Sequence, residues 1–182
     1  EHDVARKRRK MVIVDGYNVL RSGSRYVHMR QLPDYTHDTF NRVREALISD
    51  VASFAGSEYE AVIVFDAADN SESAGKTEKI SGVRIMFSPF GSSADKIIEK
   101  LAHDAREKRI ETLVVTSDAT IQDTVFGGGV DRMSANGFSL EMDSLSEEAA
   151  LDKEVTVKRK ATVQDRIDKD TLAKLKALRD RM

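Results

Sequence analysis

Strand-length apolar runs alternate with segments of helical period along this chain, and the alternation limits its possible folds more than any other feature. Residues 11–14, 61–65, 83–87 and 112–116 are short runs of mostly apolar residues. Uninterrupted apolar runs are typical of parallel strands that are covered by helices on both faces. We therefore predict an α/β fold in which helices flank a central, mostly parallel sheet.

Two long helices are expected between these runs. Apolar residues three and four apart predict a helix over residues 38–55, and Gly56 fits its C-cap. Ser93 is a candidate N-cap for a second helix over residues 94–108. Helices in these places supply the long crossover connections that parallel strands require.

The second half of the chain shows weaker patterns. Residues 118–126 are expected to form a short helix, and the glycines of residues 127–129 a loop, because successive glycines destabilise regular elements. Residues 134–150 carry an imperfect helical pattern, and residues 151–163 look extended and polar. A last helix is expected over residues 168–181, where leucines are spaced three apart.

Composition and charge exclude several functional classes. The 182 residues include no cysteine, which excludes disulfides, thiolate metal sites and a cysteine nucleophile. No apolar run approaches the ~20 residues that span a bilayer, so no membrane partner is expected. The net charge of −2 hides two basic ends. We divide the chain into a basic tail at residues 1–10, a globular domain at 11–150 and a basic extension with a terminal helix at 151–182.

Acidic side chains follow every predicted strand. Asp15 and Asp66 come directly after the first and second strands, Asp118 follows the fourth, and Asp95 follows the third after a short loop. The carboxyl ends of parallel strands meet at one edge of a sheet, so these residues are expected to converge. Clustered carboxylates repel one another unless a cation neutralises them or their pKa values rise. Their convergence therefore predicts a metal site.

The donor types indicate the metal and the chemistry. Oxygen ligands without a neighbouring His or Cys favour Mg²⁺ or Mn²⁺ over zinc. Such ions polarise a phosphoryl oxygen and activate water near neutral pH, so hydrolysis of a phosphodiester is the expected reaction. Asn18 is a candidate to orient metal-bound water or phosphate. Thr116 and Ser117 are candidates to donate hydroxyl groups to the acids, and Lys96 to contact phosphate.

Each of these residues also has an ordinary structural interpretation. An Asp after a strand can form a turn, an Asp in the first turn of a helix is stabilised by the helix dipole, and an Asn before a helix forms a local turn. These roles explain the acids singly, but not why four of them follow four strands. The four histidines show no metal-ligand spacing and are expected to be structural or exposed.

Four short motifs carry a resemblance to a known family. They are VDGYN at residues 14–18, VFDA at 64–67, SADKIIEKLA at 93–102 and VTSD at 115–118. In order and spacing they resemble the YacP-like branch of the NYN family, whose members are PIN-like nucleases. The resemblance runs from Met11 through about Gly129, and the final helix is similar to the C-terminal extension of that branch.

This resemblance implies a metal-dependent endoribonuclease on a PIN-like α/β sandwich. The bacterial member of the branch is a ribosome-associated enzyme that cuts mRNA in the ribosomal A site during translation. Asp15 and Asp95 match the family's principal catalytic acids. Asn18, Asp66 and Asp118 match its other site positions. The implied catalytic residues are thus Asp15, Asp95, Asn18 and Asp118, and the implied metal ligands are Asp15, Asp66, Asp95 and Asp118.

RNA and the ribosome are the expected partners, with the basic ends holding mRNA or rRNA. The expected location is the cytoplasm, or the plastid stroma if the chain is a processed organelle precursor. The alternative is a non-catalytic RNA- or ribosome-binding module with the same fold, whose acids serve structure only. A phosphatase of the haloacid dehalogenase type is disfavoured because no second Asp stands two residues after Asp15.

Overall fold

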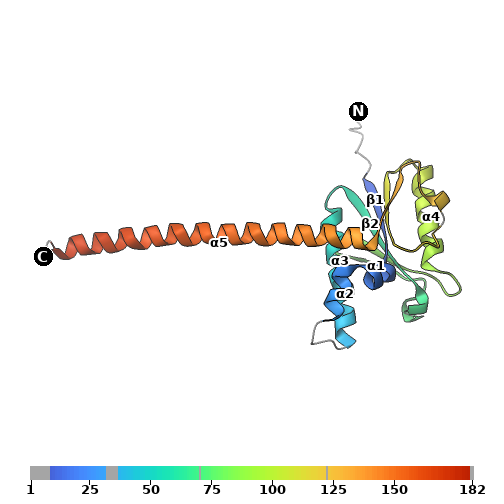
Figure 1. Ribbon diagram of the computed structural model, residues 1–182, viewed down its shortest axis with the longest axis horizontal. Coiled ribbons are helices and arrows are strands. Elements are labelled where there is room, and N and C mark those ends of the chain that lie inside the picture. The colour runs from blue at the N-terminus through green and yellow to red at the C-terminus, as the bar shows by residue number, and fades with distance from the viewer. Residues whose placement is uncertain (1–8, 32–36, 70, 122, 181–182) are drawn as a thin grey trace. The chain divides into compact units, whose positions relative to one another are not determined.

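The computed structural model of the protein describes residues 9–31, 37–69, 71–121 and 123–180 (Figure 1). Most of the predicted basic tail, residues 1–8, lies outside these ranges. The chain divides into two compact units, Glu1–Met142 and Asp143–Met182. Within the described residues, no helix combines the length and the apolar character that crossing a bilayer requires.

A six-stranded sheet forms the centre of the first unit. Its strands are β1 (Lys10–Asp15), β2 (Tyr59–Phe65), β3 (Thr77–Ile80), β4 (Val83–Phe87), β5 (Thr112–Val115) and β6 (Val130–Met133). Their order across the sheet is β3-β4-β2-β1-β5-β6, and every neighbouring pair is parallel except β3 with β4. The predicted α/β class and mostly parallel sheet are confirmed.

Helices cover both faces of this sheet. The helices of the described chain are α1 (Gly16–Ser22), α2 (Ser24–Arg30), α3 (His37–Ala55), α4 (Ala94–Glu107) and α5 (Ala135–Asp180), with short 3-10 turns η1 (Ala67–Asp69), η2 (Ser71–Ser73) and η3 (Asp123–Val125). Only the start of α5 belongs to the first unit. In Figure 1, α3 and α4 lie on opposite sides of the strands. The buried residues accordingly form two clusters, one with α1 to α3 and the start of α5, the other with α4.

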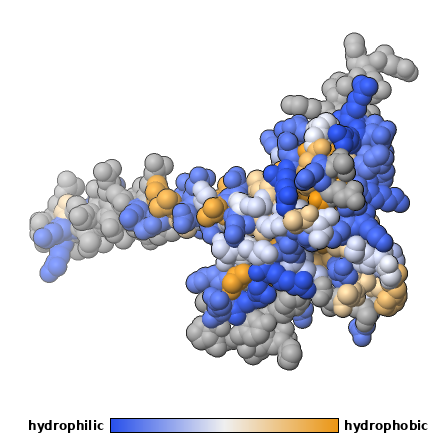
Figure 2. Space-filling view, turned by 45° about the vertical axis from the view of Figure 1, so that its right-hand side comes forward, coloured by the Kyte–Doolittle hydropathy of each residue, from blue (hydrophilic) through white to orange (hydrophobic). Residues whose placement is uncertain are grey.

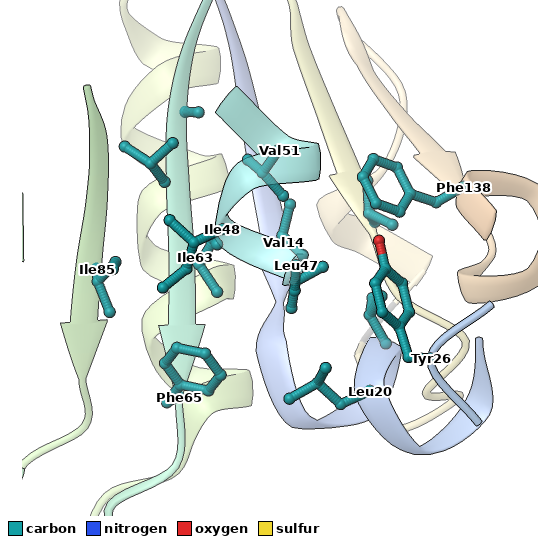
Figure 3. Packing of buried hydrophobic residues seen from close by; sticks show 14 of the residues in the cluster. Val14, Leu20, Tyr26, Leu47, Ile48, Val51, Ile63, Phe65, Ile85 and Phe138 are labelled. Atoms are coloured by element: carbon teal, nitrogen blue, oxygen red, sulfur yellow. The ribbon is translucent and has the colours of Figure 1, made fainter. Parts of the chain in front are cut away.

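Alternate residues of the central strands contribute to the two clusters. Figure 3 shows Val51 of α3 in one cluster with Val14 of β1 and Ile63 of β2. Ile13 and Val62, which point to the opposite face of the same two strands, belong to the cluster of α4. Burial on both faces explains why these strands read as uninterrupted apolar runs.

The four predicted strands and the two predicted long helices are confirmed, with their ends shifted by at most two residues. Gly56 follows α3 with a positive φ of 48°, and its N–H donates to the carbonyl of Ala52 (3.1 Å). The side chain of Ser93 accepts a hydrogen bond from the N–H of Lys96 (3.4 Å) at the start of α4. Both predicted caps are therefore present.

The predicted short helix over residues 118–126 is wrong. The chain there forms turns, among them η3. The side chain of Asp118 accepts a hydrogen bond from the N–H of Thr120 (2.9 Å), and such a local contact competes with helical hydrogen bonding. The loop predicted at residues 127–129 is confirmed, since all three glycines there have positive φ.

Residues 151–163, predicted to be extended, lie inside α5 instead. This helix runs without a break and joins the two helical segments expected on either side. β-branched residues such as Val155 favour an extended reading, but Ala, Leu, Glu and Lys predominate around them and favour helix. Glu154 and Lys158 also form an ion pair one turn apart (3.7 Å).

The second unit contains most of α5. Large apolar side chains are exposed along it, at Leu145, Leu151 and Val155. Figure 2 shows orange side chains separated by blue ones along this helix. Several side chains in its last third lie outside the described residues, among them the three leucines of the predicted final helix.

Candidate metal centre

Three of the predicted acids converge at the carboxyl edge of the sheet. Asp15 ends β1, Asp95 lies in the first turn of α4, and Asp118 follows β5. One carboxylate oxygen of each lies within 4.8 Å of the others. β1 and β5 are neighbours, with Val14 opposite Val115, so the residues that follow these two positions emerge side by side.

Asp15 is the most buried of the three acids. It is 5% exposed, whereas Asp95 and Asp118 are half-buried. Burial raises the pKa of Asp15 from 3.8 to about 6, and the carboxylates of Asp95 and Asp118 add to this effect. A hydrogen bond from Thr116 acts in the opposite direction. A bound cation would relieve this accumulation of negative charge.

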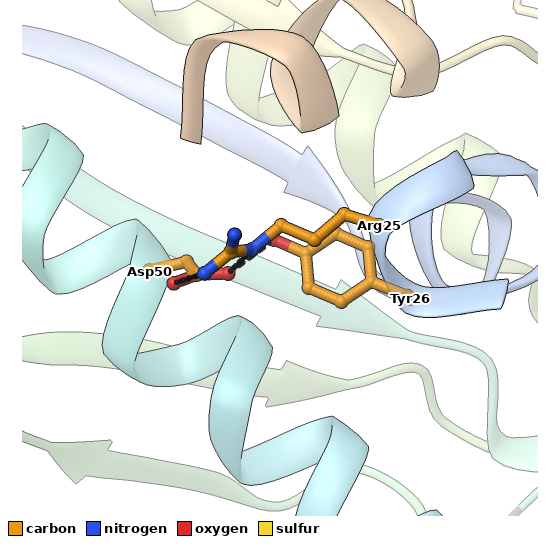
Figure 4. Close-up of polar contacts among 3 residues, drawn as sticks. All are labelled: Arg25, Tyr26 and Asp50. Atoms are coloured by element: carbon orange, nitrogen blue, oxygen red, sulfur yellow. Dashed lines mark hydrogen bonds and ion pairs between the residues drawn. The ribbon is translucent and has the colours of Figure 1, made fainter. Parts of the chain in front are cut away.

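A second buried carboxylate, Asp50 on α3, shows how the fold satisfies an acid without a metal. It accepts two hydrogen bonds from Arg25 (2.9 and 3.2 Å) and one from the hydroxyl of Tyr26 (2.8 Å), as Figure 4 shows. A guanidinium therefore neutralises its charge. Within the described residues, no Arg or Lys pairs in this way with the three acids at the carboxyl edge.

The hydroxyl of Thr116 lies among several hydrogen bonds at this edge. Thr116 is fully buried, donates to Asp15 Oδ2 (3.0 Å) and accepts from the N–H of Asp118 (3.0 Å). Asn18 of α1 accepts a hydrogen bond at Oδ1 from the N–H of Ser117 (2.8 Å). These contacts tie α1 and β1 to the chain after β5 and orient Asp15 without neutralising it.

Thr120 forms hydrogen bonds with the other two acids, and its role was not predicted from the sequence. Its hydroxyl donates to Asp95 Oδ2 (2.6 Å), and its N–H donates to Asp118 Oδ1 (2.9 Å). Each bond engages one oxygen of a carboxylate and leaves the second oxygen as a potential ligand. The pattern Asp-x-Thr indicates a local turn, but it does not reveal which distant acid the hydroxyl reaches.

Arg132 on β6 holds the segment that carries Asp118. Its Nε donates to the carbonyl of Thr116 (3.2 Å), and its Nη2 donates to the carbonyl of Asp118 (3.3 Å). The guanidinium also lies 5.7 Å from the ring centroid of Phe126. Arg132 contacts backbone carbonyls, so it positions the segment without pairing with the carboxylates. The sequence did not indicate β6, and it therefore gave no signal for Arg132.

Asp66 lies next to this group but outside it. Its Oδ1 accepts from the N–H of Ala68 (2.9 Å), and its Oδ2 accepts from the N–H of Ala94 (3.5 Å). The second contact joins the end of β2 to the first residue of α4, the helix that carries Asp95. Asp66 thus supports the start of that helix.

Close packing explains the glycine that follows Asp15. A Cβ at Gly16 would lie 2.3 Å from the ring of Phe65. That ring is fully buried and packs against Tyr17, with 4.8 Å between the ring centroids. Glycine therefore lets α1 begin directly at the end of β1, which keeps Asn18 beside the chain that follows β5.

The donor set fits a hard divalent cation. Three carboxylates offer one oxygen each within a small volume, and no histidine of the described chain belongs to the group. Oxygen-only sites suit Mg²⁺ and Mn²⁺ better than zinc. The acidic group can therefore hold a metal ion.

Known proteins share both the sequence pattern and the fold. A family profile described as a YacP-like NYN domain matches residues 12–180, a range that includes all four predicted acids. YacP of Bacillus subtilis is 30% identical to this chain over 135 residues, which are 74% of this chain and 76% of that protein.

Two crystal structures of Rae1 (YacP) from Bacillus subtilis superimpose on this chain. One has a TM-score of 0.60 at 24% identity, covering 93% of this chain and 94% of the other. The second, of a mutant, has a TM-score of 0.61 at 25% identity and covers 81% and 83%.

Proposed function

This chain belongs to the YacP-like NYN domain family, and from that premise we propose that it is a metal-dependent endoribonuclease. The proposed substrate is mRNA on translating ribosomes, and the proposed reaction is hydrolysis of a phosphodiester bond. The observation that carries the proposal is the convergence of three carboxylates within 4.8 Å. A purely structural set of acids would not need to gather in this way.

Asp15, Asp95 and Asp118 are proposed to hold Mg²⁺ or Mn²⁺. Such an ion, when bound, polarises a phosphoryl oxygen and lowers the pKa of water. Asp66 joins the proposed ligand set if the 3.5 Å hydrogen bond from Ala94 gives way. If that bond persists, Asp66 acts by fixing the first turn of α4.

Neutral side chains are proposed to set the geometry of the site. Thr116 orients Asp15, and Thr120 orients Asp95 and Asp118. The carbonyl oxygen of Asn18 is engaged by Ser117, which leaves its amino group as a donor for a phosphate oxygen. We therefore assign Asn18 a role in binding the scissile phosphate.

The nuclease function is assigned to residues 11–150, and contacts with RNA or the ribosome to the basic ends at 1–10 and 151–182. Both ends are rich in Lys and Arg. Attraction of this kind releases counterions from the RNA, so binding should weaken steeply as salt rises. Translating ribosomes occur in the cytoplasm and in the plastid stroma, which are the proposed locations.

The proposal can be tested on ribosomes that translate a defined mRNA, with Mg²⁺ and Mn²⁺ present. Wild type, Asp95→Asn and Asp104→Asn are added in parallel, and new 5′ ends are mapped. Asp104→Asn is the matched control because Asp104 is an exposed acid on the same helix. We expect wild type and the control to produce ends in register with the reading frame, and Asp95→Asn to produce none.

Two outcomes would contradict the proposal. Equal cleavage by Asp95→Asn would remove the acids from the reaction. If no variant cuts while all of them sediment with ribosomes, the chain is a binding module. Titration calorimetry with Mn²⁺ adds an independent readout, because binding of the ion should depend on Asp15 and Asp95 even without RNA.

A further inference from the structure

The loop between β4 and α4 emerges at the same edge of the sheet as the three acids. Phe87, the last residue of β4, lies opposite Phe65 in the parallel register, and Asp66 follows Phe65. The loop then runs into α4, whose first turn carries Asp95. Figure 1 shows this loop at the end of the strands where α1 begins. Residues 88–93 therefore lie beside the candidate metal centre.

The aromatic ring of Phe90 is exposed on this loop. It is 77% exposed, more than any other large apolar side chain in the described ranges. A ring of this size in water forgoes the free energy that its burial would supply. A flat partner that covered the ring would recover that free energy.

Hydrogen bonds hold the backbone on both sides of Phe90. The fully buried Ser88 donates through its hydroxyl to the carbonyl of Ser92 (3.3 Å). The N–H of Ser92 donates to the carbonyl of Pro89 (3.1 Å), which closes a β-turn. Gly91 has the positive φ (76°) that the third position of a type II turn requires, and Phe90 occupies the second. A turn that is already ordered loses less conformational entropy when a ligand binds.

Two exposed lysines flank the loop. The carbonyl of Lys76 accepts a hydrogen bond from the N–H of Phe87 (2.9 Å), and Lys96 lies in the first turn of α4. Neither lysine forms an ion pair with another described residue. Proteins hold single-stranded RNA with an aromatic ring and nearby cations, because the bases stack on the ring and the phosphates meet positive charge.

The surroundings of Phe90 favour a nucleobase over an apolar protein surface. Beyond Pro89, its neighbours on the turn are Gly91 and Ser92. An apolar protein contact requires a contiguous apolar patch, whereas one ring is enough to stack one base. At most about 18 Å of backbone separates Phe90 from Asp95, so a single RNA strand can reach both residues.

We propose that Phe90 stacks on a base of the substrate RNA near the scissile phosphate, and that Lys76 and Lys96 attract the phosphates of the same strand. The inference rests on the proposed function and adds the surface that holds the strand beside the metal centre. Every base has a flat π face, so the stack accepts many sequences. Phe90 is thus a substrate-binding residue that takes no part in the chemistry.

Binding of an unstructured eight-nucleotide RNA to the full chain in EDTA tests this contact while no RNA is cut. Fluorescence anisotropy measures the affinity, and NMR detects NOEs between the ring protons of Phe90 and base protons. We expect these NOEs in wild type. Phe90→Ala and Phe90→Leu should each weaken binding by about tenfold or more, because neither side chain stacks on a base. Phe90→Tyr should restore most of the affinity, because its ring stacks.

Ile80→Ala is the matched control. It also removes an exposed large apolar side chain, but Ile80 ends β3 opposite Val83, the first residue of β4, and so lies at the other edge of the sheet. It should leave RNA binding unchanged. A strand of the same length without bases should bind wild type and Phe90→Ala equally, because stacking is then absent from both complexes.

The proposal is overturned if Phe90→Ala binds the RNA as tightly as wild type, or if this variant also loses affinity for the strand without bases. If Phe90→Ala keeps its affinity for RNA but no longer sediments with ribosomes, Phe90 contacts a protein instead. Cleavage of mRNA by wild type is a separate result: it can fail while the stack is found, and it can be found while the stack fails.

Discussion

The two edges of the central sheet carry charges of opposite sign, and the hydrogen bonds that support these charged side chains differ between the edges. At the carboxyl edge, neutral donors on Thr116 and Thr120 hold each acid in a fixed orientation. At the opposite edge, where the parallel strands begin (the amino edge), Arg84 of β4 and Lys79 of β3 are direct register partners, and Nε of Arg84 has no hydrogen-bond partner. A metal ion demands a defined arrangement of ligands. The local support at the carboxyl edge thus matches the proposed metal ion, and the two opposed cations have no comparable support.

The largest effect on RNA cleavage is expected from Asp118→Asn, which removes one acid at the carboxyl edge. Loss of one of three converging carboxylates should lower the rate of RNA cleavage by on the order of 10²–10³-fold. Asp66→Asn should cost far less, because both oxygens of Asp66 are engaged by N–H groups. Initial rates of mRNA cleavage, with Asp104→Asn as control, measure both. Equal losses in the two variants would place Asp66 inside the metal centre.

The stability of the metal-free protein should fall as pH rises from about 4 to about 6. Asp15 ionises near 3.8 when unfolded and near 6 when folded, so the folded state binds more protons in this window. The loss in the free energy of unfolding should approach about 3 kcal/mol, with little further change above pH 6.

Urea unfolding in EDTA at several pH values measures this loss. Asp15→Asn should remove that part of the slope, and Mg²⁺ should raise the stability of wild type most above pH 6. If wild type and Asp15→Asn respond identically to pH, the charge of Asp15 is already satisfied within the fold.

A smaller effect is expected from Arg132→Met, which keeps the acids but loosens their support. Without the hydrogen bonds from Arg132 to the carbonyls of Thr116 and Asp118, affinity for Mn²⁺ should fall about tenfold. Calorimetry measures the change, and Arg42→Met, at an exposed position on α3, is the control. Unchanged affinity would show that the hydrogen bonds of Thr116 and Thr120 alone orient the carboxylates.

The smallest effect is expected at the amino edge. Arg84→Met should raise the free energy of unfolding by about 0.5–1 kcal/mol, because it removes the like-charge pair with Lys79 and the unpaired Nε while keeping an apolar stem. Urea unfolding measures the gain. A loss of stability would show that Arg84 contributes to the free fold.

The convergence of Asp15 and Asp118 at the carboxyl edge could be predicted from the sequence, because the register of the parallel strands brings the two residues together. Asp15 and Asp118 follow strands that read clearly as apolar runs, and parallel pairing brings such positions together. Thr120 and Arg132 were not anticipated because their roles depend on tertiary contacts. The helix expected from Asp118 onward failed for a related reason, since the side chain of Asp118 bonds locally to Thr120.

The sequence contains little indication of the two outer strands, β3 and β6, or of the residues at the amino edge of the sheet. β3 is exposed at every position, and only Val130 of β6 is buried, so neither strand shows an apolar run. Arg9, Lys79 and Arg84 are ordinary surface residues in the sequence, and only the pairing of β3 with β4 makes two of them neighbours. The continuity of α5 was missed because β-branched residues such as Val155 favour a strand, although the Ala, Leu, Glu and Lys residues around them favour a helix.

The hydrogen bond between Thr116 and Asp15 joins residues that are 101 positions apart. During synthesis, Asp15 leaves the ribosome long before Thr116 and Asp118 do, and Arg132 follows later still. The three carboxylates therefore cannot assemble until the chain has been made past Asp118. An enzyme that cut mRNA on ribosomes would remain inactive toward its own template until most of the sheet had been translated.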